Sequence, residues 1–308
     1  MTTFLLIQKI FSLFLVIGAG VLIVKCKVLD PDDSKVLSKI SVYLIFPCVM
    51  INVFLVEYTK EIQDGIRLAF TAAILVHIGF LILSLILHRV FHMKPVETMS
   101  VVYPNAINLI MPIVMSVWGD EYLIYASAFG VVQQCMMWSH GRTIMSGKKG
   151  ISFRELFLNI QMISILIGLV LLFTRIRPPQ IVQSSLETVS DSLPFVSMLV
   201  IGMLVGTVSI REIFRYKRIW IVAALRLLVC PLLAMIVFRL LHLGSTVAEG
   251  SVILAICILS TASPSANMVV QMAQIFDQDA RYASMINVIT VLLCIVTMPV
   301  MLAVYLAF

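Results

Sequence analysis

Long apolar runs dominate the chain, and short polar stretches separate them. A helix that crosses a bilayer needs about 20 mainly apolar residues, and ten stretches of this sequence satisfy that requirement. The predicted spans cover residues 4–24, 36–55, 67–88, 97–118, 122–141, 156–174, 182–208, 219–241, 249–275 and 282–306. The pattern therefore predicts an all-α membrane protein with ten transmembrane helices and short connections.

The composition agrees with residence in lipid. Of the 308 residues, 61% are hydrophobic and only 12% are charged, whereas soluble domains have about 45–50% apolar and about 25% charged residues. The first apolar run contains Lys9 and lacks a small-residue cleavage site. We therefore expect it to be a true span and not a cleaved signal peptide.

The distribution of basic residues predicts the orientation. Of the 22 Lys and Arg residues, 15 fall in the odd-numbered loops and 5 in the even-numbered loops. The positive-inside rule places the odd loops in the cytoplasm and both termini outside the cell membrane. Because this rule accounts for the net charge of +6, and we identify no RNA-binding signature of aromatic and basic residues, we expect no nucleic-acid partner.

The two halves of the sequence share a pattern. Asp120, Tyr125, Ala126 and Ser127 recur with identical spacing as Asp277, Tyr282, Ala283 and Ser284, and the pair Pro31 and Pro47 recurs as Pro178 and Pro194. Residues 1–145 and 146–308 are therefore predicted to be two copies of five helices. An odd number of spans per copy makes the repeats inverted, which is typical of alternating-access transporters.

Proline and amide residues interrupt the fourth and ninth spans at corresponding places. The fourth span contains Pro104, Asn105, Asn108 and Pro112, and the ninth contains Ser263, Pro264, Ser265 and Asn267. Proline removes a backbone donor, and the freed carbonyls need partners in lipid. We expect two broken helices that cross near the bilayer midplane and direct half-helix N-termini at a carboxylate.

Several segments carry a resemblance to a known family. They are Asp30-Pro31-Asp32 through Phe46-Pro47, Asn105 to Pro112, Gln134-Cys135-Met136-Met137-Trp138, Arg226 with Pro231, and Pro264 to Asn267. Through them nearly the whole chain resembles the bacterial auxin efflux carrier family. It is more distantly similar to the plant PIN auxin exporters and to the bile acid/sodium symporter superfamily.

The resemblance implies ten helices in two inverted repeats, with broken helices 4 and 9 crossing at Pro112 and Pro264. It also implies a scaffold of helices 1, 2, 6 and 7 and a transport domain of helices 3–5 and 8–10. Substrates of the family are organic anions, including auxin and dicarboxylates such as malate. Ile107 and Ile110 stand where the family usually has glycine, so the shape of the pocket and the identity of the substrate stay open.

These observations define a candidate site. The predicted substrate-binding residues are Asn105, Asn108, Pro112, Gln134, Pro264, Ser265 and Asn267. Gln133 and Gln134 lie on adjacent helix faces, so only one is expected to face the crossing, and the resemblance favours Gln134. The candidates for proton or sodium coupling, or for anion attraction, are His77, Asp191 and Arg226.

Each coupling candidate also has a structural interpretation. His77 is either a proton relay or a neutral histidine bonded to a neighbouring hydroxyl. Asp191 shares a helix face with Glu187 and either holds a cation or lines the outer vestibule. Arg226 either attracts an anion, caps the carbonyls of a broken helix, or extends to the interface.

The predicted function is secondary active transport of small organic anions by alternating access, as an exporter or permease. The alternative is a magnesium-dependent, membrane-embedded transferase that uses aspartates in two cytoplasmic loops, namely Asp30, Asp32, Asp33, Asp277 and Asp279. That spacing is not the helical Asp-x-x-x-Asp arrangement, so we expect no enzyme, no resident metal and no cofactor. The sequence does not decide between a monomer and a homodimer.

Overall fold

The computed structural model describes residues 3–30, 32–55, 59–147, 158, 160–174, 176–207 and 214–307, and these are almost entirely helical. In the first half the helices are α1 (Thr3–Lys25), α2 (Asp33–Ile40), α3 (Phe46–Val53), α4 (Lys60–Arg89), α5 (Pro95–Val102), α6 (Met111–Val117), α7 (Leu123–Met136) and α8 (Arg142–Ser146). In the second half they are α10 (Ile160–Thr174), α11 (Gln180–Ser190), α12 (Leu193–Thr207), α14 (Lys217–Ala224), α15 (Cys230–Leu240), α16 (Gly250–Ala262), α17 (Asn267–Ile275) and α18 (Ala280–Ala307).

In the described part of the chain, the predicted spans overlap helices or consecutive helical segments. Five of these stretches, including α4 and α18, are long and apolar enough to cross a membrane, and shorter apolar helices include Ala106–Val117 and Gly250–Ala262. Many large apolar side chains on the outer faces of α4 and α15, such as Ile78, Ile82 and Ile236, are exposed. Lipid suits these faces better than water does, so the structure confirms an all-α membrane protein.

Short π-helical turns interrupt four of the helical stretches. They are η1 (Ser41–Ile45), η2 (Ala106–Ile110), η4 (Met137–Gly141) and η5 (Leu225–Val229). Three of them end two residues before a proline, at Pro47, Pro112 and Pro231. Proline lacks the N–H that an α-helical bond needs and clashes with the carbonyl four residues earlier, so the chain widens locally at these positions.

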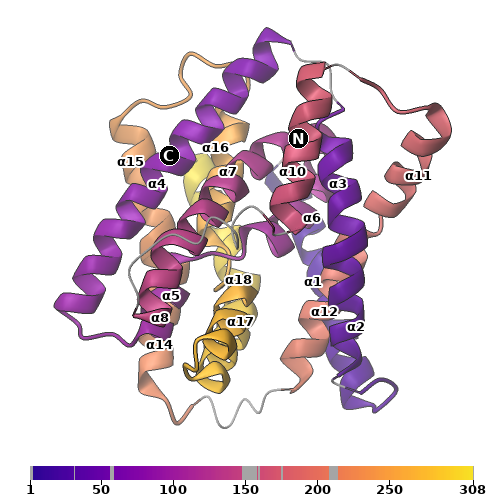
Figure 1. The fold of residues 1–308 in the computed structure, drawn as a ribbon. Coiled ribbons are helices and arrows are strands. Elements are labelled where there is room, and N and C mark those ends of the chain that lie inside the picture. The colour runs from indigo at the N-terminus through magenta and orange to yellow at the C-terminus, as the bar shows by residue number, and fades with distance from the viewer. Residues whose placement is uncertain are drawn as a thin grey trace.

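The helices form two groups that lie side by side (Figure 1). In one group α1 packs along α12, and α10 and α11 pack against α3. In the other, α4 packs against α5, α7, α15 and α16, and α18 packs against α14, α16 and α17. Contacts of α12 with α6 and of α1 with α18 connect the groups.

Glycine permits the close contact between α1 and α12. A side-chain Cβ at Gly202 would overlap the carbonyl oxygen of Ile17, and a Cβ at Gly20 would lie 2.9 Å from the Cα of Gly202. The two backbones can therefore approach each other only because neither glycine carries a side chain. Small residues allow the same close approach between many membrane helices.

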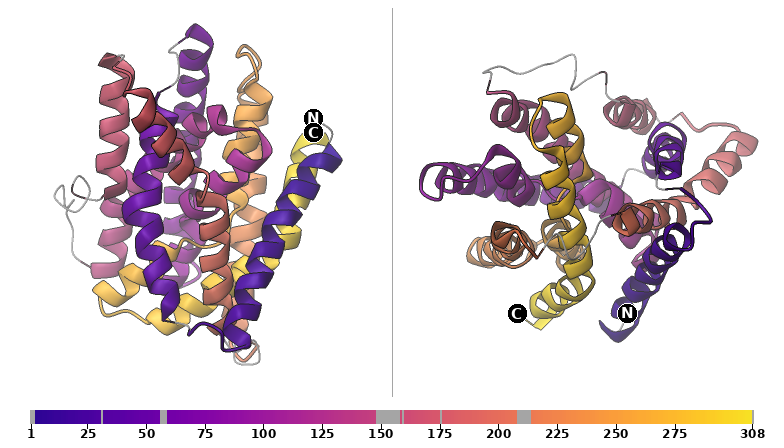
Figure 2. Two further views of the ribbon diagram at one scale, coloured as in Figure 1. Left: turned by 90° about the vertical axis from the view of Figure 1, so that its right-hand side faces the viewer. Right: turned by 90° about the horizontal axis from the view of Figure 1, so that it is seen from below.

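The two ends of the helical body differ. The lower end in Figure 1 carries the C-terminal ends of α1, α4 and α17 and the start of α14, whereas the upper end carries both chain termini, as Figure 2 also shows. At the upper end the Tyr122 hydroxyl donates to the Glu249 carboxylate. At the lower end the Arg218 guanidinium donates to the carbonyl oxygen of His92 at 3.3 Å.

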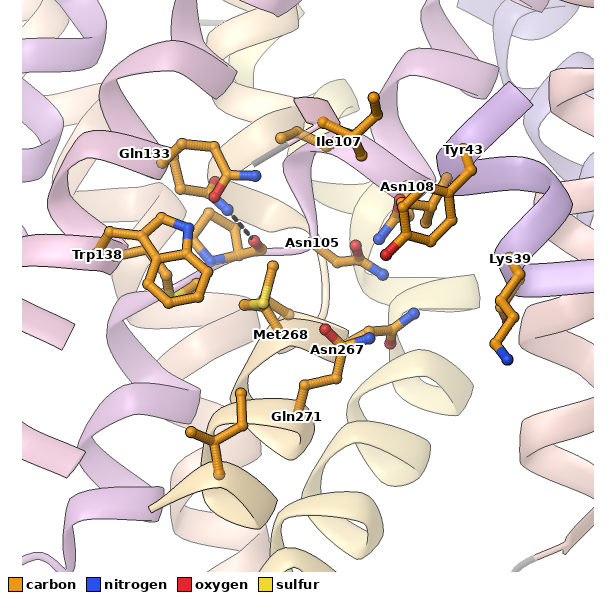
Figure 3. A pocket seen from close by; sticks show the side chains of 18 of the residues that line it. Lys39, Tyr43, Asn105, Ile107, Asn108, Gln133, Trp138, Asn267, Met268 and Gln271 are labelled. Carbon is orange, nitrogen blue, oxygen red and sulfur yellow. Dashed lines mark hydrogen bonds between the residues drawn. The ribbon is translucent and has the colours of Figure 1, made fainter. Parts of the chain in front are cut away.

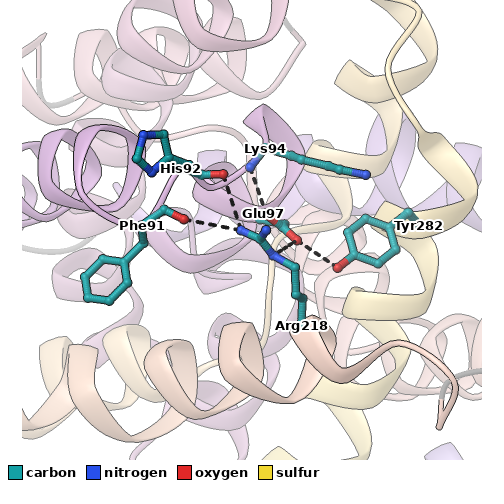
Figure 4. Close-up of polar contacts among 6 residues, drawn as sticks. All are labelled: Phe91, His92, Lys94, Glu97, Arg218 and Tyr282. Atoms are coloured by element: carbon teal, nitrogen blue, oxygen red, sulfur yellow. Dashed lines mark hydrogen bonds and ion pairs between the residues drawn. The ribbon is translucent and has the colours of Figure 1, made fainter.

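A buried carboxylate joins three helices at the lower end (Figure 4). Glu97 of α5 is fully buried and accepts hydrogen bonds from the backbone N–H of Lys94 at 2.8 Å and from the hydroxyl of Tyr282 at 2.9 Å. The guanidinium of Arg218 pairs with the same carboxylate at 3.0 Å. These bonds fix α5 to α14 and α18.

Candidate functional site at the helix crossing

Two broken helical stretches meet near the middle of the second group. Helix α5 ends at Val102, α16 ends at Ala262, and the residues that follow form a short antiparallel pair between Pro104 and Ser265. The N–H of Asn105 donates to the carbonyl of Pro264 at 2.8 Å, and the N–H of Ala266 donates to the carbonyl of Tyr103 at 3.0 Å. The predicted crossing of the two broken stretches is therefore present.

Proline determines where each stretch breaks. A residue that precedes proline is driven out of the helical conformation, and Tyr103 (φ −104°, ψ 110°) and Ser263 (φ −72°, ψ 158°) are both extended. The structure corrects one detail, because the crossing lies at Pro104 and not at Pro112. Pro112 is buried at the start of α6, where its missing N–H is tolerated directly after the π-helical turn η2.

Side chains from α7 and α18 satisfy backbone groups that the breaks release. The Gln133 amide donates to the carbonyl of Pro104 at 2.7 Å, and the Asn287 amide donates to the carbonyl of Ser265 at 2.6 Å. The Thr290 hydroxyl accepts a hydrogen bond from the N–H of Ser265 at 3.1 Å. Asn287 and Thr290 were not predicted from the sequence, although an amide and a hydroxyl three residues apart in an apolar helix were a usable signal.

A cavity of about 740 Å³ opens beside the crossing (Figure 3). Its walls come from α2, η1, α7, η4, α10, α17 and the segment from Pro104 to Asn108. The polar lining residues are Ser38, Lys39, Tyr43, Asn105, Asn108, Gln133, Gln134, Trp138, Asn267 and Gln271. The volume lies within the range of small-molecule sites, about 300–1,000 Å³.

The cavity combines carboxamides with apolar walls. In Figure 3 the side chains of Asn105 and Asn267 project toward the side where Tyr43 and Lys39 lie, and Trp138 lies across from them. Lys39 is the only charged residue among those that the described part of the chain contributes to this lining. The cavity extends from the crossing past Lys39, in the last turn of α2, and reaches Ile275 at the C-terminal end of α17, toward the lower end of the protein.

Three buried polar atoms of the lining have no hydrogen-bond partner within the described residues. They are the donors Nδ2 of Asn105 and Nε1 of Trp138 and the acceptor Oε1 of Gln133. A buried polar group without a partner costs about 1–3 kcal/mol. These three atoms therefore lie in the walls of the cavity with unused hydrogen-bonding capacity.

The predicted substrate-binding residues are only partly brought together. Asn105, Asn108, Gln134 and Asn267 line the cavity. Pro264 and Ser265 form the crossing itself and do not line it, and Pro112 lies in α6, outside the lining. Of the two adjacent glutamines, Gln133 contacts the crossing, whereas the resemblance favoured Gln134, and both side chains line the cavity.

The three coupling candidates do not form one cluster, because His77 and Arg226 both pack against the ring of Phe80, whereas Asp191 is distant in the chain and exposed. His77 is buried in α4, with its Nδ1 2.7 Å from the carbonyl of Ala73 and its ring beside Phe129. Asp191 directly follows α11 and is exposed. Arg226 is fully buried in η5 and donates to the backbone carbonyls of Val101 and Thr261. Of the three roles considered for Arg226, these contacts correspond to the capping of carbonyls at the broken helices.

The aspartates of the rival enzyme interpretation are engaged in local structure. Asp33 accepts from the N–H of Asp30 at 2.9 Å, Asp32 pairs with Lys35 at 2.7 Å, and Asp279 accepts from the N–H of Tyr282 at 2.9 Å. Across the residues that the structure describes, no three His, Cys, Asp or Glu side chains gather closely enough to hold a metal ion. These contacts do not favour the magnesium-dependent transferase.

Apolar helices with lipid-facing exteriors and a polar cavity at a helix crossing define an integral membrane protein of the transporter class. The chain belongs to the membrane transport protein family, of the auxin efflux carrier type, whose sequence pattern matches residues 5–152 and again residues 149–302. The predicted family is thereby confirmed. No curated protein matches the chain.

Proposed function

We propose that this protein is a secondary active transporter of small organic anions and that the cavity beside the crossing is its substrate site. The observation that carries the proposal is the set of unpartnered donors and carboxamides at a break between half-helices. Membership of a transporter family supports the same conclusion. Transporters with broken helices bind substrates near such breaks.

A carboxylate fits the polar side of the cavity. The free Nδ2 of Asn105 is a donor, and the amides of Asn108 and Asn267 line the same space. Helix α17 begins at Asn267, so its partial positive charge adds to the charge of Lys39 and favours an anion. Lys39 is exposed, so amide donors, and not a buried ion pair, would hold the carboxylate.

The remaining walls suit the carbon skeleton of the substrate. Ile107, Met137, Met268 and the ring of Trp138 line the cavity. The indole Nε1 and the free Oε1 of Gln133 provide a donor and an acceptor for a second polar group. The site therefore favours an organic anion with both an apolar portion and a further polar substituent over an inorganic anion.

The transport mechanism that we propose is alternating access. The family pattern matches the chain twice, and we propose that the two copies are inverted five-helix repeats within a ten-helix fold. The group containing α1, α3, α10 and α12 would be the scaffold, and the group around the crossing would move against it. Residues 1–145 and 146–308 are the proposed repeats.

In this proposal the structure represents the inward-facing state. The cavity extends toward the lower end, to which the predicted cytoplasmic loops belong. At the upper end the Tyr122 hydroxyl is hydrogen-bonded to the Glu249 carboxylate. Asp120, Asn52 and Ser190 line a small space at the same end. The protein would lie in the cell membrane with both termini outside.

Uptake into proteoliposomes tests the proposal. Labelled mono- and dicarboxylates, malate among them, are offered with and without a proton or sodium gradient to wild-type protein, Asn105→Ala and the control Gln180→Ala. Gln180 carries an exposed amide outside the cavity. We expect saturable uptake that Asn105→Ala lowers about tenfold or more, equivalent to the loss of one charge-assisted hydrogen bond, and that the control leaves unchanged. Absence of uptake for every carboxylate, or equal uptake by Asn105→Ala, would overturn it.

A further inference from the structure

Arg226 is a cation in the protein interior, and its position is unusual. It lies in the π-helical turn η5 with no exposed surface, and its guanidinium stands over the ring of Phe80 at 5.3 Å. Among its contacts within the described residues there is no carboxylate; the hydrogen-bond partners are two backbone carbonyls. Burying a charge costs free energy unless nearby groups compensate for it. The two carbonyls are therefore the groups that have to stabilise the guanidinium.

The two carbonyls are among those that lose their α-helical donors at the crossing. In a continuous α-helix the carbonyl of Val101 would accept from the N–H of Asn105, and that of Thr261 would accept from the N–H of Ser265. At the crossing the Asn105 N–H donates to Pro264 instead, and the Ser265 N–H donates to the Thr290 hydroxyl. Each orphaned carbonyl lies three residues before the proline of its break.

One side chain restores both bonds. The Nη1 of Arg226 donates to the carbonyl of Val101 at 2.6 Å, and its Nη2 donates to the carbonyl of Thr261. Helices α5 and α16 thus present their C-terminal ends to the same guanidinium. Since each helix C-terminus carries about half a negative charge, two of them together supply about the charge that one buried cation needs.

This geometry has a consequence for the energy source of transport. Two convergent carbonyl ends form a site that a hard cation such as Na⁺ could otherwise occupy, because backbone oxygens are its usual ligands in broken-helix transporters. Here a covalently attached cation already lies between them. Arg226 cannot be deprotonated or exchanged under ordinary conditions, so the charge at this place stays constant through the transport cycle.

We infer that Arg226 is the resident cation of the crossing: it holds the two breaks in register in place of an exchangeable metal ion, and transport needs no sodium at this position. The inference deepens the proposed function and rests on it. Arg226 is a positioning residue, because it touches the crossing and does not line the cavity.

The test combines thermal unfolding in detergent with uptake. The variants are Arg226→Lys, Arg226→Gln, Arg226→Ala and the control Leu227→Ala, which shortens a buried neighbour in the same turn. We expect Arg226→Ala and Arg226→Gln to unfold at lower temperature and to lose about tenfold or more of uptake, with Arg226→Lys between them and the wild type. Millimolar guanidinium should raise the unfolding temperature of Arg226→Ala and restore part of its uptake, without rescuing Leu227→Ala.

The wild-type protein supplies a measurement that does not depend on any variant folding. Its unfolding temperature should be the same in sodium and in choline salts. The inference would be overturned if the wild-type unfolding temperature rose saturably with sodium concentration. It would also be overturned if Arg226→Gln kept the unfolding temperature and the uptake of the wild type. A different outcome separates the two proposals. If guanidinium restores the stability of Arg226→Ala but the wild-type protein takes up no carboxylate, the proposed function is refuted and the role of Arg226 remains.

Discussion

Replacement of Asn287 by alanine tests how the crossing is held together. The Asn287 amide donates to the carbonyl of Ser265 at 2.6 Å and to the Oδ1 of Asn267 at 3.0 Å, so it connects α18 to the break and to a residue that lines the cavity. Removal of this amide leaves the Ser265 carbonyl buried without that donor, at a cost of about 1–3 kcal/mol. For a chain of this length roughly 2 °C of unfolding temperature corresponds to 1 kcal/mol, so we expect a loss of about 4 °C.

The same substitution should weaken substrate binding. Without Asn287 the Asn267 side chain loses the contact that orients it, and its immobilisation by substrate then costs about 0.5–1.5 kcal/mol. The half-saturating concentration for uptake should rise by a factor of about 2 to 13.

Ser260→Ala is the matched control. Ser260 is fully buried in the last turn of α16, but its hydroxyl donates only to the carbonyl of Ile256 in its own helix, at 2.9 Å. Its loss should change stability by less than about 0.5 kcal/mol and leave half-saturation unchanged. The reasoning is refuted if Asn287→Ala, Ser260→Ala and the wild type all have the same unfolding temperature and the same half-saturating concentration.

Three further predictions concern parts of the fold outside the crossing. Burial raises the pKa of Asp120 above its ordinary value of 3.8, and the neighbouring carboxylates at the upper end raise it further. Its ionisation therefore opposes this conformation as the pH rises above 3.8. Asp120→Asn should unfold at higher temperature than the wild type at neutral pH, and the difference should vanish in acid; a difference that persists or grows in acid would contradict this. Glu97→Ala removes a fully buried carboxylate but leaves Arg218 half exposed to water. It should lower stability toward the low end of the roughly 3–5 kcal/mol seen for broken buried pairs, measurable by thermal unfolding, and an unchanged midpoint would count against the network in Figure 4. Gly202→Val would force a side chain into the backbone of α1 at Ile17. It should cost about 1–3 kcal/mol or more, visible as a lower unfolding temperature, whereas Gly18→Ala, with open space around it, should not.

Much of the helical framework could be predicted from the sequence because it depends on local patterns. Apolar runs of the length of a bilayer identify the spans, and prolines among amides identify the interrupted ones. The choice between Pro104 and Pro112 depended on the tertiary structure. Both prolines prevent regular α-helical bonding, but only at Pro104 does another chain segment offer replacement hydrogen bonds, through Pro264 and Ala266.

The partners of the crossing depend on contacts between distant residues, which a single sequence does not contain. Gln133 and Gln134 differ by about 100° around the helix, and the cavity proved broad enough to include both. Lys39 and Tyr43, from one helical stretch, and Trp138, from another, join the lining and were not predicted. For Arg226 the sequence provided the residue and its options, but the role followed only from the two carbonyls that lie 125 and 35 residues away.

The most direct test of alternating access is the accessibility of single cysteines on the two sides of the crossing. In a protein with its six native cysteines replaced, Gln271→Cys marks the cavity on the lower side and Asn52→Cys marks the small space at the upper end. Without substrate, we predict that a membrane-impermeant maleimide modifies Gln271→Cys from the cytoplasmic side and hardly modifies Asn52→Cys from outside. Under transport conditions with a carboxylate that the protein carries, the first rate should fall and the second should rise. Simultaneous access to both positions, or rates that substrate does not change, would contradict the account.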